Sequence, residues 1–179
     1  MNLFCNDFIF RKKKLLTPEE CNKLIEFYKS NDKRVNRNNY YTCVDFNPYT
    51  QFFEKKIGLA VRGWRDKYPF LFTMVHTWKV DNFSNIQKYN PGQYYSGLHC
   101  EHSPRQESLR RIGAWMIYLN TIKKGGGTEF PSQKKVIKPI QGDCYIWPSG
   151  WTHPNRAPVP YTQLTLPTHN YVYNQRVAI

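Results

Sequence analysis

The chain has 179 residues, of which 40% are hydrophobic and 16% aromatic, enough to bury one good core and short for two. A formal net charge of +13 favours acidic partners or nucleic acid, although a basic, well-solvated surface is the simpler interpretation. No run approaches the roughly 18 apolar residues of a membrane span, and no charged segment precedes an apolar one at the N-terminus, so we expect neither a membrane helix nor a signal peptide.

The cysteines are odd in number, widely spaced and free of any Cys-x-x-Cys pair: Cys5, Cys21, Cys43, Cys100 and Cys144. This spacing argues against a disulfide framework and against a zinc site. We therefore expect reduced thiols and an intracellular protein that is not secreted.

The first predicted element is a helix from about Pro18 to Lys29. Thr17 is a good N-cap, a proline suits the first helical position, and Glu20 can close a capping box. The polar, asparagine-rich segment Ser30 to Asn39 is predicted to be a loop. A second helix is expected from about Thr50 to Tyr68, with apolar side chains along one side.

From about residue 70 the chain turns to short β-rich runs separated by Gly, Pro and Asn. The predicted strands are Phe72 to Val80, Asn85 to Asn90, Gly97 to His102, Ile112 to Asn120, Thr128 to Pro131, Lys135 to Lys138, Asp143 to Pro148 and Leu164 to Tyr173. Short strands without intervening helices favour a mainly β fold, a double-stranded β-helix (jelly-roll, cupin-like) barrel with two supporting helices. We expect a single domain over 1–179, with a helical support region at 1–69 and the jelly-roll core at 70–179.

Candidate metal ligands lie in His99-Cys100-Glu101 and, further along the chain, at His153. Two imidazoles and one carboxylate can hold Fe(II) on one face and leave the other coordination positions open for a co-substrate and O2. On an extended strand His99 and Glu101 point the same way, while Cys100 and His102 point to the opposite face. With 5 histidines and 13 acidic residues in the chain, one His-x-Asp/Glu pair is expected by accident roughly a third of the time, so its surroundings matter.

These surroundings form an ordered series of motifs. They are Tyr89-Asn90-Pro91-Gly92-Gln93-Tyr94-Tyr95, His99-Cys100-Glu101, Trp115-Met116-Ile117-Tyr118-Leu119-Asn120, Gly125-Gly126-Gly127-Thr128-Glu129-Phe130-Pro131, Gly142-Asp143 and Trp147-Pro148-Ser149-Gly150-Trp151-Thr152-His153. In this order they resemble the prolyl 4-hydroxylase-like 2-oxoglutarate and Fe(II)-dependent dioxygenases, most of all the small versions encoded by tailed bacteriophages. The resemblance spans roughly residues 70 to 173.

The resemblance implies that His99, Glu101 and His153 hold Fe(II), with Glu101 in place of the usual aspartate. The phage-like members usually carry a second histidine where this chain has Asn155, so His153 would serve as ligand only through a slipped register. The implied cofactors are Fe(II), the co-substrate 2-oxoglutarate and O2, with ascorbate as an optional reductant. The implied reaction hydroxylates a prolyl or other peptide residue and yields succinate and CO2.

The resemblance also implies a pocket for 2-oxoglutarate, whose distal carboxylate is normally held by a basic side chain. Gln163 stands ten residues beyond His153 in the place of that residue, and a neutral amide is the weaker partner for a carboxylate. Tyr118 matches a tyrosine that hydrogen-bonds the distal carboxylate, and Tyr89 matches one near the iron-chelating end. Arg110 and Arg156 are alternative sources of the missing cation, and the choice between them stays open.

Two other functions fit the sequence. The chain could be a catalytically silent jelly-roll binding module with a basic surface, which Gln163 and Asn155 favour. It could be an oxidative nucleic-acid demethylase, which suits the net charge, although the paired arginines expected after the last histidine are missing. For the dioxygenase we expect a peptide or protein substrate, with nucleic acid as an alternative partner and no membrane, and a cytoplasmic location, in the host cell if a phage encodes it. The oligomeric state stays open.

Overall fold

The computed structural model describes residues 7–30, 34–37, 40–43, 50–73, 78–80, 85–95, 97–102, 110–158 and 170–178. Its helices are α1 (Pro18–Ser30) and α2 (Thr50–Lys67), with the short 3-10 helices η2 (Pro69–Phe72) and η3 (Pro131–Gln133). Its strands are β1 (Phe10–Lys12), β2 (Arg34–Arg37), β3 (Tyr40–Cys43), β4 (Lys79–Val80), β5 (Asn85–Tyr89), β6 (Arg111–Tyr118), β7 (Thr128–Phe130), β8 (Lys135–Ile137), β9 (Cys144–Pro148) and β10 (Asn170–Ala178).

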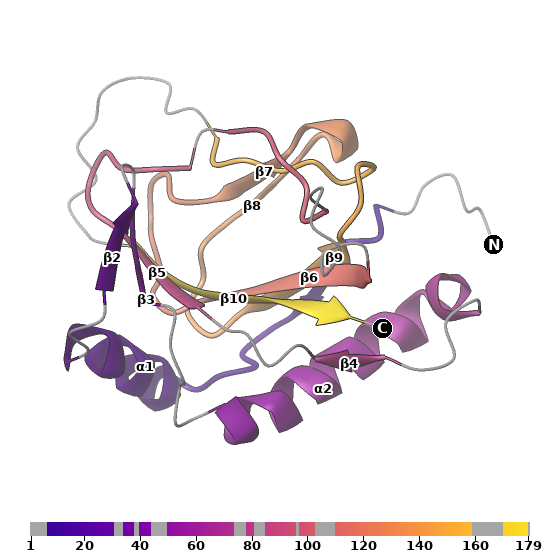
Figure 1. Cartoon of the computed structure of the whole chain (residues 1–179), viewed down its shortest axis with the longest axis horizontal. Coiled ribbons are helices and arrows are strands. Elements are labelled where there is room, and N and C mark those ends of the chain that lie inside the picture. Colours follow the sequence, from indigo (N-terminus) through magenta and orange to yellow (C-terminus); the bar gives the residue numbers. More distant parts are fainter. Residues whose placement is uncertain are drawn as a thin grey trace.

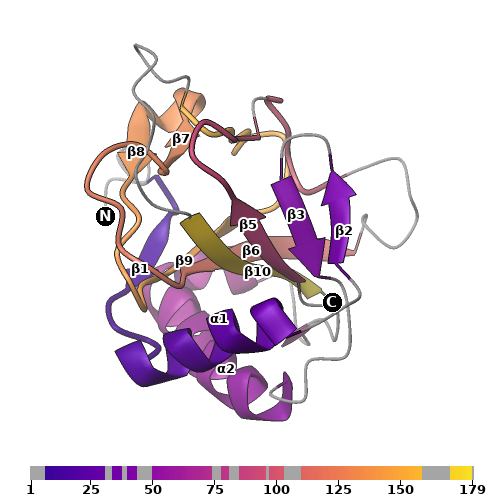
Figure 2. The same cartoon turned by 90° about the vertical axis from the view of Figure 1, so that its left-hand side faces the viewer.

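The strands form two sheets of different size. The large sheet has the order β1-β9-β6-β10-β5-β3-β2, with β4 paired to β10, and its pairings are antiparallel. The small sheet consists of β7 and β8. Helices α1 and α2 cover one face of the large sheet, while β7 and β8 lie over its other face (Figure 1 and Figure 2). The fold is therefore mainly β with two supporting helices, as the sequence predicts.

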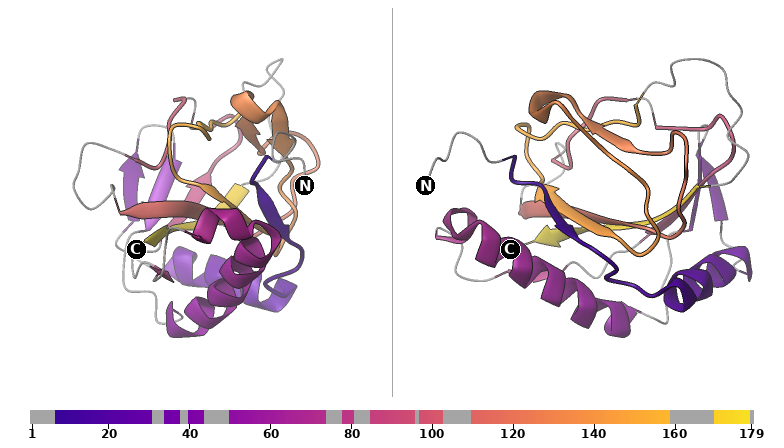
Figure 3. Two further views of the ribbon diagram at one scale, coloured as in Figure 1. Left: turned by 90° about the vertical axis from the view of Figure 1, so that its right-hand side faces the viewer. Right: turned by 180° about the vertical axis from the view of Figure 1, so that it is seen from behind.

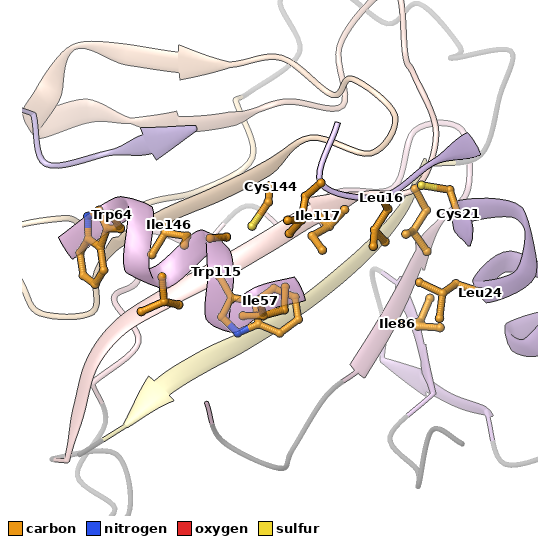
Figure 4. Packing of buried hydrophobic residues seen from close by; sticks show 14 of the residues in the cluster. Leu16, Cys21, Leu24, Ile57, Trp64, Ile86, Trp115, Ile117, Cys144 and Ile146 are labelled. Carbon is orange, nitrogen blue, oxygen red and sulfur yellow. The ribbon is translucent and has the colours of Figure 1, made fainter. Parts of the chain in front are cut away.

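Alternation along β6 builds a core on each face of the large sheet. Trp115 and Ile117 belong to the cluster packed against the helices, whereas Met116 and Tyr118 belong to the cluster shared with β7 and β8. Successive side chains of a strand point to opposite faces, so one strand can serve both cores. Figure 4 shows the helix-facing core, where Ile57 and Trp64 of α2 lie beside the side chains of the sheet.

The start of α1 is the capping box that the sequence predicts. The Thr17 backbone N–H donates to Glu20 Oε2 at 2.8 Å, and the Glu20 N–H donates to the Thr17 hydroxyl at 3.3 Å. Lys56 of α2 then reaches Glu20 with Nζ–O distances of 2.5 and 2.6 Å. Although burial acts to raise the pKa of Glu20, the Lys56 hydrogen bond, the Thr17 N–H and nearby lysine charges lower it overall. The capping residue of α1 therefore also ties α1 to α2.

A short N-terminal strap, residues 7–12, ends in β1, which lies along β9 at one edge of the large sheet (Figure 3). Arg11 anchors the strap through an ion pair with the buried Asp143, with 2.7 Å between Nε and Oδ2. The Trp64 indole N–H donates to the carbonyl of Phe8 at 3.0 Å. Ile9 is buried in the same cluster as Met116. The strap therefore forms the edge strand of the large sheet, and its Ile9 side chain packs into the core between the two sheets.

Residues 1–69 were expected to form a helical support region, but their described part also contains strands. They supply β1, β2 and β3 to the large sheet. The predicted loop Ser30 to Asn39 contains β2, because a polar strand at a sheet edge has no apolar alternation to reveal it. No helix in the described ranges is long and apolar enough to cross a membrane.

Four further predicted strands differ from the structure. Within Phe72 to Val80 only β4 is a strand, and residues 74–77 lie outside the described part of the chain. Gly97 to His102 makes a single β-bridge at His99 in place of a strand. Of Leu164 to Tyr173, residues 164–169 are not described and the rest belongs to β10. Ile112 to Asn120 corresponds to β6 but ends at Tyr118.

Candidate metal centre

His99 and Glu101 lie side by side, with 3.7 Å between His99 Nε2 and Glu101 Oε1. The His99 Nδ1 atom is 2.9 Å from the carbonyl oxygen of Gly97. Because a carbonyl can only accept, Nδ1 carries the proton and Nε2 keeps a free lone pair beside the carboxylate. Tyr95 packs edge-on against the imidazole, with 4.6 Å between ring centroids. An imidazole oriented through its second nitrogen in this way is typical of metal-binding histidines.

Main-chain bonds hold this pair against the segment 149–156. The His99 N–H donates to the Asn155 carbonyl at 3.1 Å, and the Asn155 N–H donates to the His99 carbonyl at 2.8 Å. The Glu101 N–H donates to the carbonyl of Ser149 at 3.0 Å. The position of the His99–Glu101 pair is therefore set by backbone contacts with a segment about fifty residues further along the chain.

His102, the rival ligand in the sequence, has a structural role. Its Nε2 atom lies 2.7 Å from the Arg111 carbonyl and 3.1 Å from the Ser149 hydroxyl. The Nε2–H donates a hydrogen bond to the Arg111 carbonyl, so this nitrogen carries a proton and has no free lone pair for a metal. The thiol of Cys100 lies 3.6 Å from the His102 carbonyl. These contacts agree with the prediction that neither residue binds the metal.

Asn155 faces His99 across the β-bridge. Residues directly opposite in an antiparallel pair have side chains on the same face, with Cβ atoms about 4.5–5.5 Å apart. The Asn155 side chain is 5% exposed, and its Nδ2 atom has no hydrogen-bond partner among the described residues. A buried amide end without a partner is costly, and the backbone of Asn155 is bonded directly to that of His99.

His153 is engaged elsewhere. It is 4% exposed, its Nε2 is 2.8 Å from the Asp7 carbonyl, and its Nδ1 is 2.9 Å from the Thr152 hydroxyl. The carbonyl requires Nε2 to donate, so Nδ1 accepts from Thr152 and both ring nitrogens are used. Burial lowers the pKa of His153 although the Asp7 carbonyl acts in the opposite direction, which favours a neutral ring. Within the described ranges no three His, Cys, Asp or Glu side chains converge as for a metal ion, so the structure does not bring His153 to His99 and Glu101.

Residues 84–172 match the family model described as the 2OG-Fe(II) oxygenase superfamily. This part of the chain belongs to that superfamily. A search of curated proteins gives no significant match. The family assigns the chain to the Fe(II)- and 2-oxoglutarate-dependent dioxygenases, oxidoreductases whose cofactors are Fe(II), 2-oxoglutarate and O2. The predicted likeness to phage-encoded members stays a prediction.

Solved structures with the same fold include prolyl hydroxylases. The viral collagen prolyl hydroxylase of Paramecium bursaria Chlorella virus-1, in complex with 2OG, is 18% identical with a TM-score of 0.69, covering 98% of each chain. A Pseudomonas putida prolyl-4-hydroxylase is 14% identical with a TM-score of 0.67, covering 95% of this chain and 91% of that one. A Trichoplax adhaerens prolyl hydroxylase in complex with a hypoxia inducible factor peptide fragment is 13% identical with a TM-score of 0.64, covering 97% and 84%. At these identities the likeness is one of fold.

The donors that the 2OG-Fe(II) oxygenase segment offers fit a divalent ion at two positions. Metal bonds of about 2.0–2.2 Å to nitrogen and oxygen can span the 3.7 Å between His99 Nε2 and Glu101 Oε1. The residue opposite His99 in the β-bridge is Asn155 and not His153, the predicted second imidazole. Fe(II) held there would supply the open coordination face on which 2-oxoglutarate and O2 bind.

Two hydroxyl groups meet in the interior between the sheets. The Tyr118 hydroxyl is 2.9 Å from the Thr128 hydroxyl, and burial raises the pKa of Tyr118 far above its ordinary value. Tyr118 therefore stays protonated as a hydrogen-bond donor. Thr128 was not singled out from the sequence, although its place after three glycines at the start of β7 is visible there. The Tyr89 hydroxyl donates to Gln87 Oε1 at 2.9 Å.

The residues predicted to hold the distal carboxylate of 2-oxoglutarate have different environments in the structure. Arg110 is exposed and precedes β6. Arg156 is ion-paired with Glu129, with 2.7 Å between Nε and Oε2. Gln163 lies outside the described residues. Among the described residues, the hydroxyl groups of Tyr118 and Thr128 therefore remain as buried hydrogen-bonding groups that could contact the distal carboxylate.

Proposed function

We propose that the protein hydroxylates a prolyl or other peptide residue, with 2-oxoglutarate as co-substrate and succinate and CO2 as co-products. The observation that carries the proposal is the oriented His99–Glu101 pair, 3.7 Å between donor atoms, in a fold shared with prolyl hydroxylases. One of those neighbours holds a peptide fragment, which supports a peptide substrate here.

In this proposal the two sheets are the opposing walls of a double-stranded β-helix within a single domain, 1–179. The buried cluster between β6, β7 and β9 supports this arrangement, because Met116, Phe130 and Trp147 exclude water from the space between the walls. A dry interior strengthens every electrostatic contact made to a bound co-substrate.

The proposed division of roles follows the contacts. His99 and Glu101 hold the ion. One hydroxyl of the Tyr118–Thr128 pair donates to the other, and the second hydroxyl donates a hydrogen bond to the distal carboxylate of 2-oxoglutarate. Hydrogen bonds to a charged group contribute about 1.5–3 kcal/mol each, which offsets part of what a missing Lys or Arg would supply. Gln163, Arg110 and Tyr89 stay predicted contributors to this pocket. His153 is assigned to packing rather than to the metal, because both of its nitrogens are used.

Exposed apolar side chains beside the pair support a peptide partner. Tyr95 is 39% exposed, Leu98 55% and Trp151 82%, and they lie on the two segments that meet at His99. Exposed aromatic side chains next to a catalytic centre are typical contact points for peptides. The unpaired cysteines Cys21, Cys100 and Cys144 support a reducing compartment such as the cytoplasm.

The test is succinate formation from 2-oxoglutarate by the full chain with Fe(II), using proline-containing peptides, together with the visible charge-transfer band of the anaerobic iron complex. We expect a band and peptide-stimulated succinate, both lost in His99→Ala. Bound iron without a band at millimolar 2-oxoglutarate, and without succinate, would overturn the proposal. That result would favour a catalytically silent binding module, the second candidate, which Asn155 at the third ligand position favours.

A further inference from the structure

We infer that Asn155 is the third protein ligand of the metal centre, so that the ion is held by one imidazole, one carboxylate and one amide oxygen. This inference deepens the proposed function and rests on it. It differs from the ligand set that the sequence predicts, because His153 is replaced and a nitrogen donor is exchanged for an oxygen donor.

The first support is position. His99 and Asn155 exchange both main-chain hydrogen bonds, 3.1 and 2.8 Å, which is the pattern of a directly opposed antiparallel pair. Their side chains therefore emerge on one face, and Glu101 lies beside the His99 ring on that face. Two neighbouring residues of one segment and one residue of the opposing segment can surround a single ion.

The second support is the unsatisfied amide of Asn155. The side chain is 5% exposed and its Nδ2 has no hydrogen-bond partner within the described part of the chain. Leaving a buried polar group unpaired costs about 1–3 kcal/mol. The oxygen and nitrogen of a side-chain amide are assigned from their partners. Turning the amide by half a turn would place Oδ1 at the position of Nδ2, where no described residue makes a hydrogen bond. An ion beside His99 and Glu101 would satisfy that oxygen.

The third support is that the other candidate is occupied. His153 donates to the Asp7 carbonyl at 2.8 Å and accepts from Thr152 at 2.9 Å. Releasing the ring to bind a metal would break both of these hydrogen bonds. The Asn155 side chain makes no such contact with the residues that the structure describes.

The chemical consequence is a change in metal preference. Imidazole suits the later first-row ions, whereas amide and carboxylate oxygens suit Mn(II) and other hard ions. A centre with one nitrogen and two oxygen donors should bind Ni(II) with less advantage over Mn(II) than a centre with two imidazoles. This preference can be measured without any turnover.

The experiment is isothermal titration of the full chain with Mn(II) and with Ni(II), for wild type, Asn155→His, Asn155→Asp and Asn155→Ala. We expect Asn155→His to strengthen Ni(II) binding by about tenfold or more, and Mn(II) binding by less. The isosteric Asn155→Asp should strengthen binding of both ions, and Asn155→Ala should weaken Mn(II) binding. Thermal unfolding checks that each variant is folded.

Two controls fix the location. Asn22→His places a new imidazole on the exposed side of α1 and should leave both affinities unchanged. His153→Ala should also leave them unchanged. Unaltered affinities in folded Asn155→His and Asn155→Asp, an Asn155→Ala variant that binds like wild type, or loss of binding in His153→Ala would each overturn the inference.

The outcomes separate this inference from the proposed function. Metal binding that depends on Asn155, without any succinate formation, would remove the dioxygenase and leave the ligand set intact. Succinate formation together with metal affinities that do not change on substitution of Asn155 would support the dioxygenase and overturn the assignment of Asn155 as a ligand.

Discussion

At the scale of single residues, the proposed metal centre depends on which side-chain nitrogen and oxygen atoms are not already used in hydrogen bonds within the protein. His99 and His153 are both held by a carbonyl, of Gly97 and Asp7 respectively. The difference lies in the second nitrogen, which faces Glu101 in His99 and accepts from Thr152 in His153. The sequence alone does not distinguish these two histidines, and their hydrogen-bond partners support the proposal that His99 binds the metal and His153 has a packing role.

His153→Ala should destabilise the protein by about 1–3 kcal/mol, because the Asp7 carbonyl loses its donor and a void remains where the buried imidazole was. Denaturant unfolding of the metal-free protein measures the effect. His153→Gln, whose amide can still donate to Asp7, should recover part of the loss. A His153→Ala protein as stable as wild type would contradict this role.

Tyr118→Phe should raise the KM for 2-oxoglutarate by about tenfold or more, since one hydrogen bond to a carboxylate is removed, worth about 1.5–3 kcal/mol. Mn(II) affinity should not change. Tyr145→Phe is the matched control, because Tyr145 packs edge-on against Tyr118 and its hydroxyl makes only a long contact, 3.5 Å, to the Lys138 carbonyl. Equal effects in both variants would assign Tyr118 to packing alone.

At the scale of elements, the helices were predictable and the edge strands were not. The capping box and apolar side of α1 are local signals, so its predicted range differs from the observed one by a single residue. Strands β2 and β3 pair at the edge of the sheet, and at four residues each they are too short to show a clear period-two pattern in the sequence. The proposed metal centre lies between these two cases. The pairing of His99 with Glu101 could be predicted from their local spacing, but His153 and Asn155 are two residues apart, so strand alternation cannot choose between them as the further ligand. Only the long-range pairing register does.

The junction of α1 with α2 should weaken on acidification. The folded chain lowers the pKa of Glu20 below its ordinary value of 4.5, so its contribution is present above that pH and is lost as the pH falls through the folded value. Glu20→Gln should cost about 1 kcal/mol at pH 7 and nothing at low pH. Urea unfolding of both proteins between pH 7 and pH 3 measures the difference. Glu26→Gln, an exposed glutamate of the same helix, is the control, and an equal pH response in it would contradict the assignment.

At the scale of the whole molecule, the net charge of +13 should act on encounter with substrate. Long-range attraction raises association rates for acidic ligands and is screened by salt. The KM for an acidic peptide should therefore rise between low and physiological ionic strength, while that of a neutral peptide of the same length stays constant. Steady-state kinetics at several salt concentrations test this, and parallel curves for the two peptides would remove any role for the charge.

Three main-chain carbonyls of the N-terminal strap add to the contacts that its side chains make, such as the ion pairs of Asp7 with Lys135 and of Arg11 with Asp143. The carbonyls of Asp7, Phe8 and Ile9 accept bonds from His153, Trp64 and Tyr68, respectively, at 2.8, 3.0 and 3.4 Å. A carbonyl oxygen is present whatever the residue, so a single side-chain substitution at positions 7 to 9 leaves all three acceptors in place. A deletion within the strap would instead shift the three acceptors at once, away from His153 in the segment 149–156 and from Trp64 and Tyr68 at the end of α2 and just after it.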